Sequence, residues 1–459
     1  MLENVHPRED LRPLCRRKFS STESRTVSEE AAENFANDNW QVVRKRKNSV
    51  TIERAKPHNE QLEDRVWSLF YRMGFHSISG DTGARLTTPV DEGEGLSNQI
   101  DCVGIDDEVA VAVECKSSKE IGKRNRLQDE IAKLAAIRGA FAKAARSFDA
   151  ENLKKTAVTC MFLHNAIITE NDLSRAKEGQ VVLFDDNDLR YYEDLVFHLG
   201  SAARYQFLAD LLPGKEIPGL KLRLPAIRLK IAGGDAYMFS ISPEFLLKIS
   251  YVSHRQKGRG SDIDTYQRMM RRSRLKRIRE FIEAKGVFPT NIVVNFESKR
   301  LQFSRTKQED HADVDTESGL LGWLDIRPAY KSAWIIDGQH RLFGYSGTSR
   351  AAKSRLAVLA FSGLKASDQA GMFININSKQ KSVKQSLLQE LYAELHWDAE
   401  DPRMRVRAVV SKVIQSLNED KSSSFYGRIQ AADVARDERR CISLTSVKGG
   451  PIVQRVPVE

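Results

Sequence analysis

Hydrophobic and polar residues change their spacing several times along the first half of the chain, and each change predicts an element. From Asn59 to Met73 apolar side chains recur every three or four residues, and Gly74 follows, which predicts a helix. Alternation over 99–105 and 109–115 predicts a β-hairpin. Similar patterns predict a hairpin at 40–54, a helix through 127–141, strands at 157–163 and 180–184, and a helix at 188–199. This order indicates an α/β domain with a mixed sheet at 36–200, after a flexible lead-in at 1–35.

The second half begins with two Pro-Gly pairs, at 213–214 and 218–219, which indicate a domain boundary. A second domain at 215–390 follows, and then a helical C-terminal segment at 391–459 that ends abruptly, as if incomplete. The patterns in this half predict strands at 220–229, 237–240, 291–296, 333–336 and 356–361, a basic helix at 265–280 and an exposed loop at 305–318. The expected class is therefore α/β (α+β).

Composition narrows the class of protein. The 459 residues are enough for two or three domains, and 41% hydrophobic with 29% charged residues is typical of a globular chain. No run approaches the roughly 18 apolar residues of a membrane span, and the first residues lack the apolar stretch of a secretory signal. The five cysteines form no CxxC pair, which disfavours zinc and disulfides. We expect a cytoplasmic protein that does not associate with a membrane.

The charge balance favours a polyanionic partner. The net charge is +10, and the sequence pI is about 9.2. Seven lysines or arginines lie between Thr265 and Glu280, and like charges on one helix repel each other unless an anion is near. A solvated helix face would look the same, so this pattern leaves both readings open. The expected nucleic-acid-binding residues are Gln267, Arg268, Arg271, Arg272, Arg274 and Lys276.

A first set of chemical side chains lies on the hairpin at 99–115. Glu114 and Lys116 are two residues apart on one strand and project to the same side, and the partner strand can bring Asp101 beside them. Two carboxylates offer the hard oxygen ligands that Mg²⁺ or Mn²⁺ prefers, and a lysine can stabilise developing charge. A strand end that carries solvated charges is the competing explanation.

The surroundings of these residues resemble the PD-(D/E)xK superfamily, in particular Mrr-like restriction endonucleases, over 59–200. In that family an acidic helix precedes the hairpin and another helix follows it; Glu63 matches the helix acid, while Ile100 stands where a proline is common. The resemblance implies a metal-dependent nuclease with Asp101, Glu114, Lys116 and Glu63 as catalytic residues, and with Asp101 and Glu114 as the metal ligands.

A second set follows the predicted strand at 333–336, where Asp337-Gly-Gln-His-Arg341 forms a turn into a helix. Glycine allows close approach of a ligand, helix N–H groups favour phosphate, and arginine forks suit phosphate oxygens. A polar turn with a structural aspartate is the alternative. The string resembles the signature of the DGQHR-domain family, which is ParB/sulfiredoxin-like, over 220–390, with Tyr266-Gln-Arg268, Phe373–Asn377 and Lys379–Val383 in the family's order.

Members of that family include a regulator of DNA phosphorothioation genes, and related proteins with a DGQQR version act as NTPases in restriction of modified DNA. The resemblance implies that a nucleoside triphosphate is bound, and leaves its hydrolysis open. The implied cofactor-binding residues are Asp337, Gly338, Gln339, His340, Arg341 and Asn377.

Together these features favour a Mg²⁺-dependent DNA endonuclease governed by a DGQHR module, in defence against foreign or modified DNA. The expected partners are double-stranded DNA, other proteins of a modification or defence system, and a second copy of the chain, because cutting both strands needs two sites. The alternative is a DNA-binding transcriptional regulator of a DNA-modification system without nuclease activity. RNA stays open as a substrate, although no aromatic RNA-binding platform is recognisable.

Overall fold

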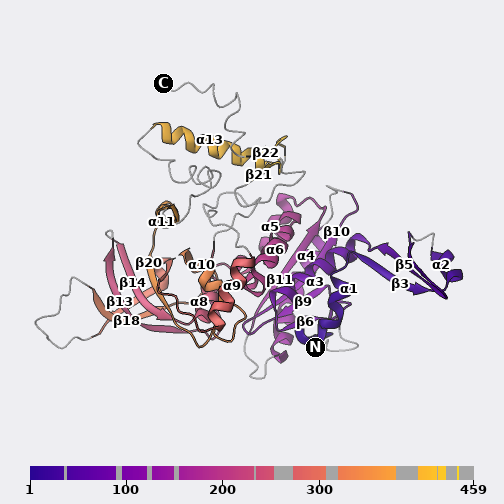
Figure 1. Ribbon diagram of the computed structural model, residues 1–459, viewed down its shortest axis with the longest axis horizontal. Helices are drawn as coiled ribbons and strands as arrows, with labels where there is room; N and C mark the ends of the chain where they lie inside the picture. Colours follow the sequence, from indigo (N-terminus) through magenta and orange to yellow (C-terminus); the bar gives the residue numbers. More distant parts are fainter. Residues whose placement is uncertain are drawn as a thin grey trace, which may run out of the picture. The chain divides into compact units, whose positions relative to one another are not determined.

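The chain folds into two compact units, Met1–Val196 (unit 1) and Phe197–Glu459 (unit 2), each described here by itself (Figure 1). The structure is a computed structural model. The residues that it describes are 1–35, 39–88, 96–120, 127–148, 155–231, 234–252, 272–306, 319–378, 402–420, 422–430 and 442–443.

Unit 1 is built on a six-stranded mixed sheet of order β12-β11-β10-β9-β6-β2. The predicted hairpin is its centre, since β10 pairs antiparallel with β9 and parallel with β11, which in turn pairs parallel with β12. Parallel neighbours need a crossover, and helices α4 and α5 supply it. The bounds are β2 Val5–Pro7, β6 Ser77–Ser79, β9 Cys102–Ile105, β10 Val109–Ser117, α4 Gln128–Ala145, β11 Thr156–His164, α5 Glu170–Gly179 and β12 Val181–Phe184.

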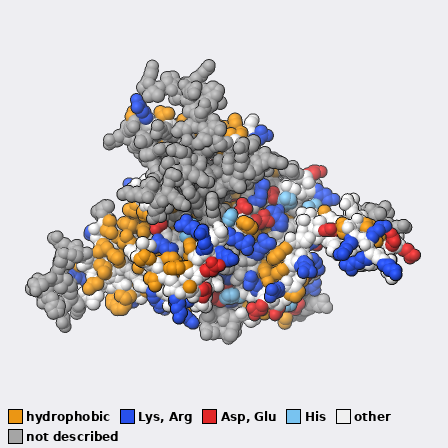
Figure 2. Space-filling view, viewed as in Figure 1, with side chains coloured by type: hydrophobic (Ala, Val, Ile, Leu, Met, Phe, Trp, Pro, Cys, Tyr) orange, Lys and Arg blue, Asp and Glu red, His pale blue; other side chains and the backbone are white. Residues whose placement is uncertain are grey.

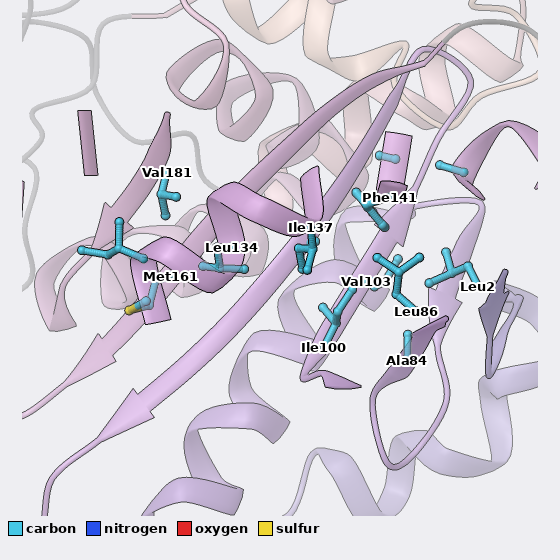
Figure 3. Close-up of a cluster of buried hydrophobic side chains, with 14 of the residues drawn as sticks. Leu2, Ala84, Leu86, Ile100, Val103, Leu134, Ile137, Phe141, Met161 and Val181 are labelled. Carbon is cyan, nitrogen blue, oxygen red and sulfur yellow. The ribbon is translucent and has the colours of Figure 1, made fainter. Parts of the chain in front are cut away.

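Helices cover both faces of this sheet, so its central strand is buried throughout Val109–Cys115. On one face, Leu134, Ile137 and Phe141 of α4 pack against Val103 and its neighbours (Figure 3). On the other, α3 (His58–Met73) lies so close to β9 that a Cβ on Gly104 would fall 2.3 Å from Phe70. Helix α6 (Asp186–Leu199) follows β12 and begins two residues before its predicted start.

The strand predicted at 99–105 is interrupted at Asp101. Residues before it form β8 (Leu96–Ile100), which joins a separate sheet of order β1-β7-β8, and residues after it form β9 of the main sheet. The other two strands of the smaller sheet are β1 (Leu2–Glu3) and β7 (Ala84–Thr88). Asp101 therefore lies where the chain passes from one sheet to the other.

The first 35 residues are not a flexible lead-in, and that expectation is corrected. β1 and β2 pair within the two sheets, so this stretch is part of the folded unit because its backbone groups complete two sheet edges. The segment also includes η1 (Arg8–Leu14) and α1 (Cys15–Lys18). The predicted boundary at residue 36 instead falls inside a small substructure.

That substructure, which we call the arm, comprises the described residues of 22–55. A three-stranded sheet of order β3-β5-β4 carries helix α2 on one side, and the predicted hairpin at 40–54 is its β4–β5 pair. The arm extends away from the six-stranded sheet (Figure 1) and has its own apolar cluster, centred on Trp40, Val50 and Ile52. The bounds are β3 Thr22–Val27, α2 Glu29–Phe35, β4 Gln41–Arg46 and β5 Ser49–Ala55.

Unit 2 is built on an eight-stranded mixed sheet of order β15-β19-β16-β20-β14-β13-β18-β17. Its strands include all five that the sequence predicts, and add β15, β17 and β18, so the α/β class with mixed sheets is confirmed. The bounds are β13 Leu222–Ile231, β14 Gly234–Ile241, β15 Ser250–Tyr251, β16 Ile292–Phe296, β17 Leu301–Arg305, β18 Leu320–Ile326, β19 Ala333–Asp337 and β20 Leu356–Ser362.

Helices pack on this sheet and follow it in the chain. The basic helix, predicted at 265–280, is described from residue 272 as α9 (Arg272–Glu283). In the C-terminal segment, α13 (Pro402–Glu419) is helical as expected, and β21 (Ile429–Gln430) pairs with β22 (Ile442–Ser443). The other helices of unit 2 are α7 Ala203–Leu211, α8 Pro243–Ile249, α10 Gln339–Gly344 and α11 Ala366–Ser378. Within the described part of the chain, no helix has the length and apolar character needed to cross a bilayer.

Candidate functional site

Strand β10 carries two of the predicted catalytic side chains to one edge of the six-stranded sheet. Glu114 lies near the end of the buried run of β10, Lys116 just beyond it, and both share the face that α4 covers. Asp101 reaches the same place from the β8–β9 junction, where its Oδ2 accepts a hydrogen bond of 2.7 Å from the backbone N–H of Cys115. The structure thus brings Asp101, Glu114 and Lys116 together, as the sequence predicts.

Two residues that the sequence analysis missed complete this cluster from α4. Lys133 donates to Glu114 Oε2 at 3.3 Å, and Lys116 lies 2.8 Å from Glu130 Oε1 and 3.8 Å from Glu114 Oε1. Glu130 and Lys133 are one turn apart on the helix that follows the strand. Their only sequence signal is this i, i+3 pair beside the apolar stripe of α4, which many helices share.

Burial and mutual repulsion leave the carboxylates with strongly perturbed acidity. Burial and then the charge of Asp101 raise the pKa of Glu114 to about 7, although Lys133 and Lys116 oppose the shift. Burial also raises the pKa of Asp101, against the lowering effects of the Cys115 N–H and Lys116. Burial alone would lower the pKa of Lys116, but its hydrogen bond to Glu130 and the surrounding carboxylates raise it on balance.

Glu63, the predicted helix acid, belongs electrostatically to this cluster. It lies on α3, and burial followed by the charge of Asp101 raises its pKa to about 7. Glu63 and Glu114 thus share the same two causes, burial and the charge of Asp101, and perturbed carboxyl groups of this kind are frequent at functional sites.

The donor set fits a hard divalent cation held by few protein ligands. Asp101 and Glu114 offer carboxylate oxygens, and Mg²⁺ is commonly held by one or two carboxylates while water and phosphate complete its shell. The tighter grouping among the described residues lies elsewhere: ligand atoms of His76, Asp106 and Asp107 are within 4.8 Å of one another at the turn of the β9–β10 hairpin. That turn is at the opposite end of the hairpin from Asp101 and Glu114.

The second predicted set forms the turn from β19 into α10. Gly338 has a φ of +95°, and a Cβ there would lie 2.6 Å from Ile292 Cδ1, so the position requires glycine. Arg341 donates to Asp337 Oδ2 at 2.9 Å and to the carbonyl oxygen of Thr290 at 2.6 Å. The charged groups of this turn are therefore mostly satisfied within the protein. The sheet carries a bulge opposite Asp337, between Val293 and Val294.

Gln339 and His340, between Gly338 and Arg341, are polar residues whose hydrogen bonding or charge is less well satisfied. Burial, with help from Arg274 and Arg341, lowers the pKa of His340 to about 4, so its ring is neutral at pH 7. Gln339 is only 7% exposed, and its Oε1 accepts no hydrogen bond from the described residues. An amide oxygen in that position is a candidate acceptor for a ligand. Asn377 lies in α11, but its side chain is outside the described residues.

The predicted nucleic-acid-binding residues are only partly described. Gln267, Arg268 and Arg271 lie outside the described residues. Arg272, Arg274 and Lys276 are exposed on α9, whereas Leu275 and Ile282 of the same helix are buried. The helix is thus amphipathic, with its cations turned to solvent, and contact with nucleic acid stays a prediction.

Comparison with known proteins places one family similarity within unit 2. No curated protein matches the chain. Among solved structures, the crystal structure of protein VC1899 from Vibrio cholerae is similar at 14% identity with a TM-score of 0.25, over 43% of this chain and 50% of that one, which is too remote to support an argument. The chain spans about half the length of that protein. Residues 224–427, which include the DGQHR turn and α9 but none of the unit 1 cluster, are similar to the DndB family, described as DNA-sulfur modification-associated.

Proposed function

We propose that this protein is a Mg²⁺-dependent DNA endonuclease that acts in a DNA-sulfur modification system. The observation that carries the proposal is the unit 1 cluster, in which Asp101 accepts a hydrogen bond from the Cys115 N–H and Lys116 lies 3.8 Å from Glu114. Burial and Asp101 raise the pKa of Glu114 to about 7 in this cluster. The link to DNA-sulfur modification rests on the family similarity of residues 224–427. A nuclease site and a link to DNA-sulfur modification in one chain together suit a role in restriction of foreign or modified DNA.

Each residue of the cluster has a distinct task in this proposal. Asp101 and Glu114 would hold the metal, and the Cys115 N–H fixes the Asp101 carboxylate by binding one of its oxygens. When bound, Mg²⁺ supplies polarisation of the scissile phosphate and a more acidic water.

Lys116, kept protonated by Glu130, is suited to orient a water or to stabilise charge on the phosphate oxygens. Glu63 is placed to take up a proton near neutral pH.

The DGQHR turn would act as the sensing module. Gly338 allows the backbone to come near a ligand, and Gln339 offers a buried amide oxygen that accepts no hydrogen bond from the described residues. A nucleoside triphosphate is the ligand that the motif resemblance implies, with Asp337, His340, Arg341 and Asn377 as its other contacts. Binding there would license cleavage by unit 1.

A transcriptional regulator without nuclease activity is the second candidate. One observation favours it: the family similarity covers the DGQHR turn and the exposed cations of α9, and it stops short of Asp101, Glu114 and Lys116. In that case the unit 1 fold would grip DNA without cutting it.

The deciding experiment is cleavage of plasmid and phage DNA, with and without phosphorothioate, by the full chain with Mg²⁺ and with ATP, GTP or CTP. We expect cutting that Asp101→Asn and Lys116→Ala each reduce by about 10³-fold or more, as loss of a metal ligand or of a charge-stabilising group does.

His76→Ala is the matched control, because it removes the tighter group of ligand atoms at the hairpin turn and should leave cleavage intact. Mg²⁺ binding measured by calorimetry should be weakened by Asp101→Asn and not by His76→Ala. Intact DNA under every condition, with tight binding by all variants, would favour the regulator.

A further inference from the structure

The arm of unit 1 carries four successive cations on its most exposed strand. Arg44, Lys45, Arg46 and Lys47 lie on β4 and at the turn after it, and all eight residues from 41 to 48 are exposed. Figure 2 shows lysine and arginine side chains gathered on the arm. Successive strand residues point to opposite sides, so the cations project from both faces of β4.

The free edge of β4 makes this surface accessible. In the order β3-β5-β4, strand β4 pairs on one side only, and Val42 and Val43 are 49% and 54% exposed. Lys45 lies 2.6 Å from Glu29, while Arg44, Arg46 and Lys47 have no carboxylate partner among the described residues. Most of the positive charge is therefore available to a partner.

The arm is folded firmly enough to present these cations. Trp40 is buried in the arm's apolar cluster between two guanidinium groups, those of Arg25 at 4.9 Å and Arg54 at 4.8 Å from its ring centre. The indole also packs edge-on against Phe35. Since the arm has this small core, β4 is a defined edge and not a loose tail.

One buried carboxylate joins both ends of the arm to α3, the helix that carries Glu63. Asp64 is 3% exposed and lies 2.7 Å from Nζ of Lys18, just before β3, and 2.5 Å from Nζ of Lys56, just after β5. Lys56 also donates to the carbonyl oxygen of Arg17 at 2.7 Å, which joins the two ends directly. Asp64 follows Glu63 on α3, so the root of the arm is fixed beside the carboxylate cluster.

We infer that the arm is a DNA-binding element, in which Arg44, Lys45, Arg46 and Lys47 contact the phosphate backbone of duplex DNA. Charge complementarity supplies the reason, since a strand with cations on both faces suits a groove, whose two walls are lined by phosphates. The inference rests on the proposed function for its substrate, DNA. The arm then holds the duplex while the cluster beside its root acts on it.

The test is the salt dependence of binding, measured by fluorescence anisotropy with the full chain, a labelled 30-base-pair DNA duplex and no divalent metal. We expect the variant Arg44→Gln/Lys45→Gln/Arg46→Gln/Lys47→Gln to lose about tenfold or more in affinity and the log–log salt slope to fall by about 2–4, because each phosphate contact contributes about 0.9. A variant with Arg44→Lys and Arg46→Lys keeps the charge and should bind like the wild type.

The control removes the same charge from cations of unit 1 outside the arm, with Lys143→Gln/Arg146→Gln/Arg175→Gln/Lys177→Gln on and just after α4 and α5, and should leave the slope nearly unchanged. If the arm variant binds DNA with the wild-type slope and merely aggregates, the cations only guard a free sheet edge and the inference is overturned. A slope change seen with duplex RNA and absent with DNA also overturns it. These outcomes are independent of cleavage, so DNA binding without cutting would count against the nuclease alone.

Discussion

The two polar sites of this protein treat their charges in opposite ways. At the DGQHR turn, Asp337 and Arg341 pair within the protein and Thr290 takes a second guanidinium hydrogen bond, while His340 is neutral. In the unit 1 cluster, three carboxyl groups retain raised pKa values despite two nearby lysines. The first arrangement therefore stabilises its own turn, whereas in the second burial holds carboxyl groups near neutrality, which makes them sensitive to pH and to a nearby cation.

The largest expected effect of the raised carboxyl pKa values in unit 1 is on cleavage activity. Because the pKa of Glu114 and Glu63 is about 7, both are mostly protonated at pH 5 and mostly ionised at pH 8. A carboxyl group must lose its proton to bind Mg²⁺, so the ionisation of Glu114 alone should raise the cleavage rate by about 50-fold from pH 5 to pH 7, and the rate should level off above about pH 8. Single-turnover rates across this range would measure it. A rate that is flat below pH 7 would contradict the assigned role of these carboxylates.

Stability should depend on pH in opposite directions in the two units when no metal is present. A raised pKa of Glu114 contributes to the free energy of unfolding below the ordinary pKa of 4.5. This contribution is lost as pH rises through 7, so unit 1 should become less stable between pH 5 and 8. The lowered pKa of His340 stabilises unit 2 above 6.5, and this contribution is lost as pH falls towards 4.

Hydrogen exchange of peptides from β10 and β19, followed by mass spectrometry, can separate these two trends. We expect changes on the order of 1–3 kcal/mol in local opening free energy. Glu114→Gln should flatten the β10 profile and His340→Gln the β19 profile, each leaving the other unchanged. Added Mg²⁺ should reverse the β10 trend, since it binds the ionised form. If the opening free energies of β10 and β19 changed with pH in the same direction, the two sites would not differ in the way described.

A smaller effect should come from the backbone of the DGQHR turn. Gly338→Ala places a Cβ 2.6 Å from Ile292 in a left-handed conformation, so we expect about 1–3 kcal/mol of destabilisation in unit 2. Gly371→Ala is the matched control, because Gly371 is in α11 with no described atom within 4 Å of a new Cβ, and alanine there should stabilise the helix by about 0.5–1 kcal/mol. The midpoints of urea unfolding of the two variants would measure this difference. Equal midpoints would mean that alanine at position 338 introduces no strain.

The sequence located both candidate sites because each lies at the end of a regular strand. The apolar run of β10 places Glu114 and Lys116 on one face, and glycine after the run of β19 marks the turn at Gly338. Periodicity of two and of 3.6 residues therefore recovered the central hairpin, helices α3 and α4, and all the strands it proposed in unit 2.

What the pattern missed depends on distant partners. β1 and β2 are only two and three residues long and become strands by pairing with residues beyond position 76, which no local pattern reveals. The break at Asp101 arises because β8 pairs with β7 and β9 with β10. Likewise Lys133 and Glu130 reach Glu114 and Lys116 through helix packing, and the pairing of Asp337 with Arg341 depends on side-chain rotamers.

The position of Asp101 between two sheets limits how the gene can change in length. A strand that slips by one residue turns every side chain to the other face, so an insertion or deletion within β8 or β9 would direct this carboxylate away from Glu114. The arm is different, because both of its ends meet at Asp64, so a change in its length leaves the six-stranded sheet in register. Natural variants should therefore change the length of the arm readily, as long as its exposed cations are kept, while the ten residues of β8, Asp101 and β9 keep their count.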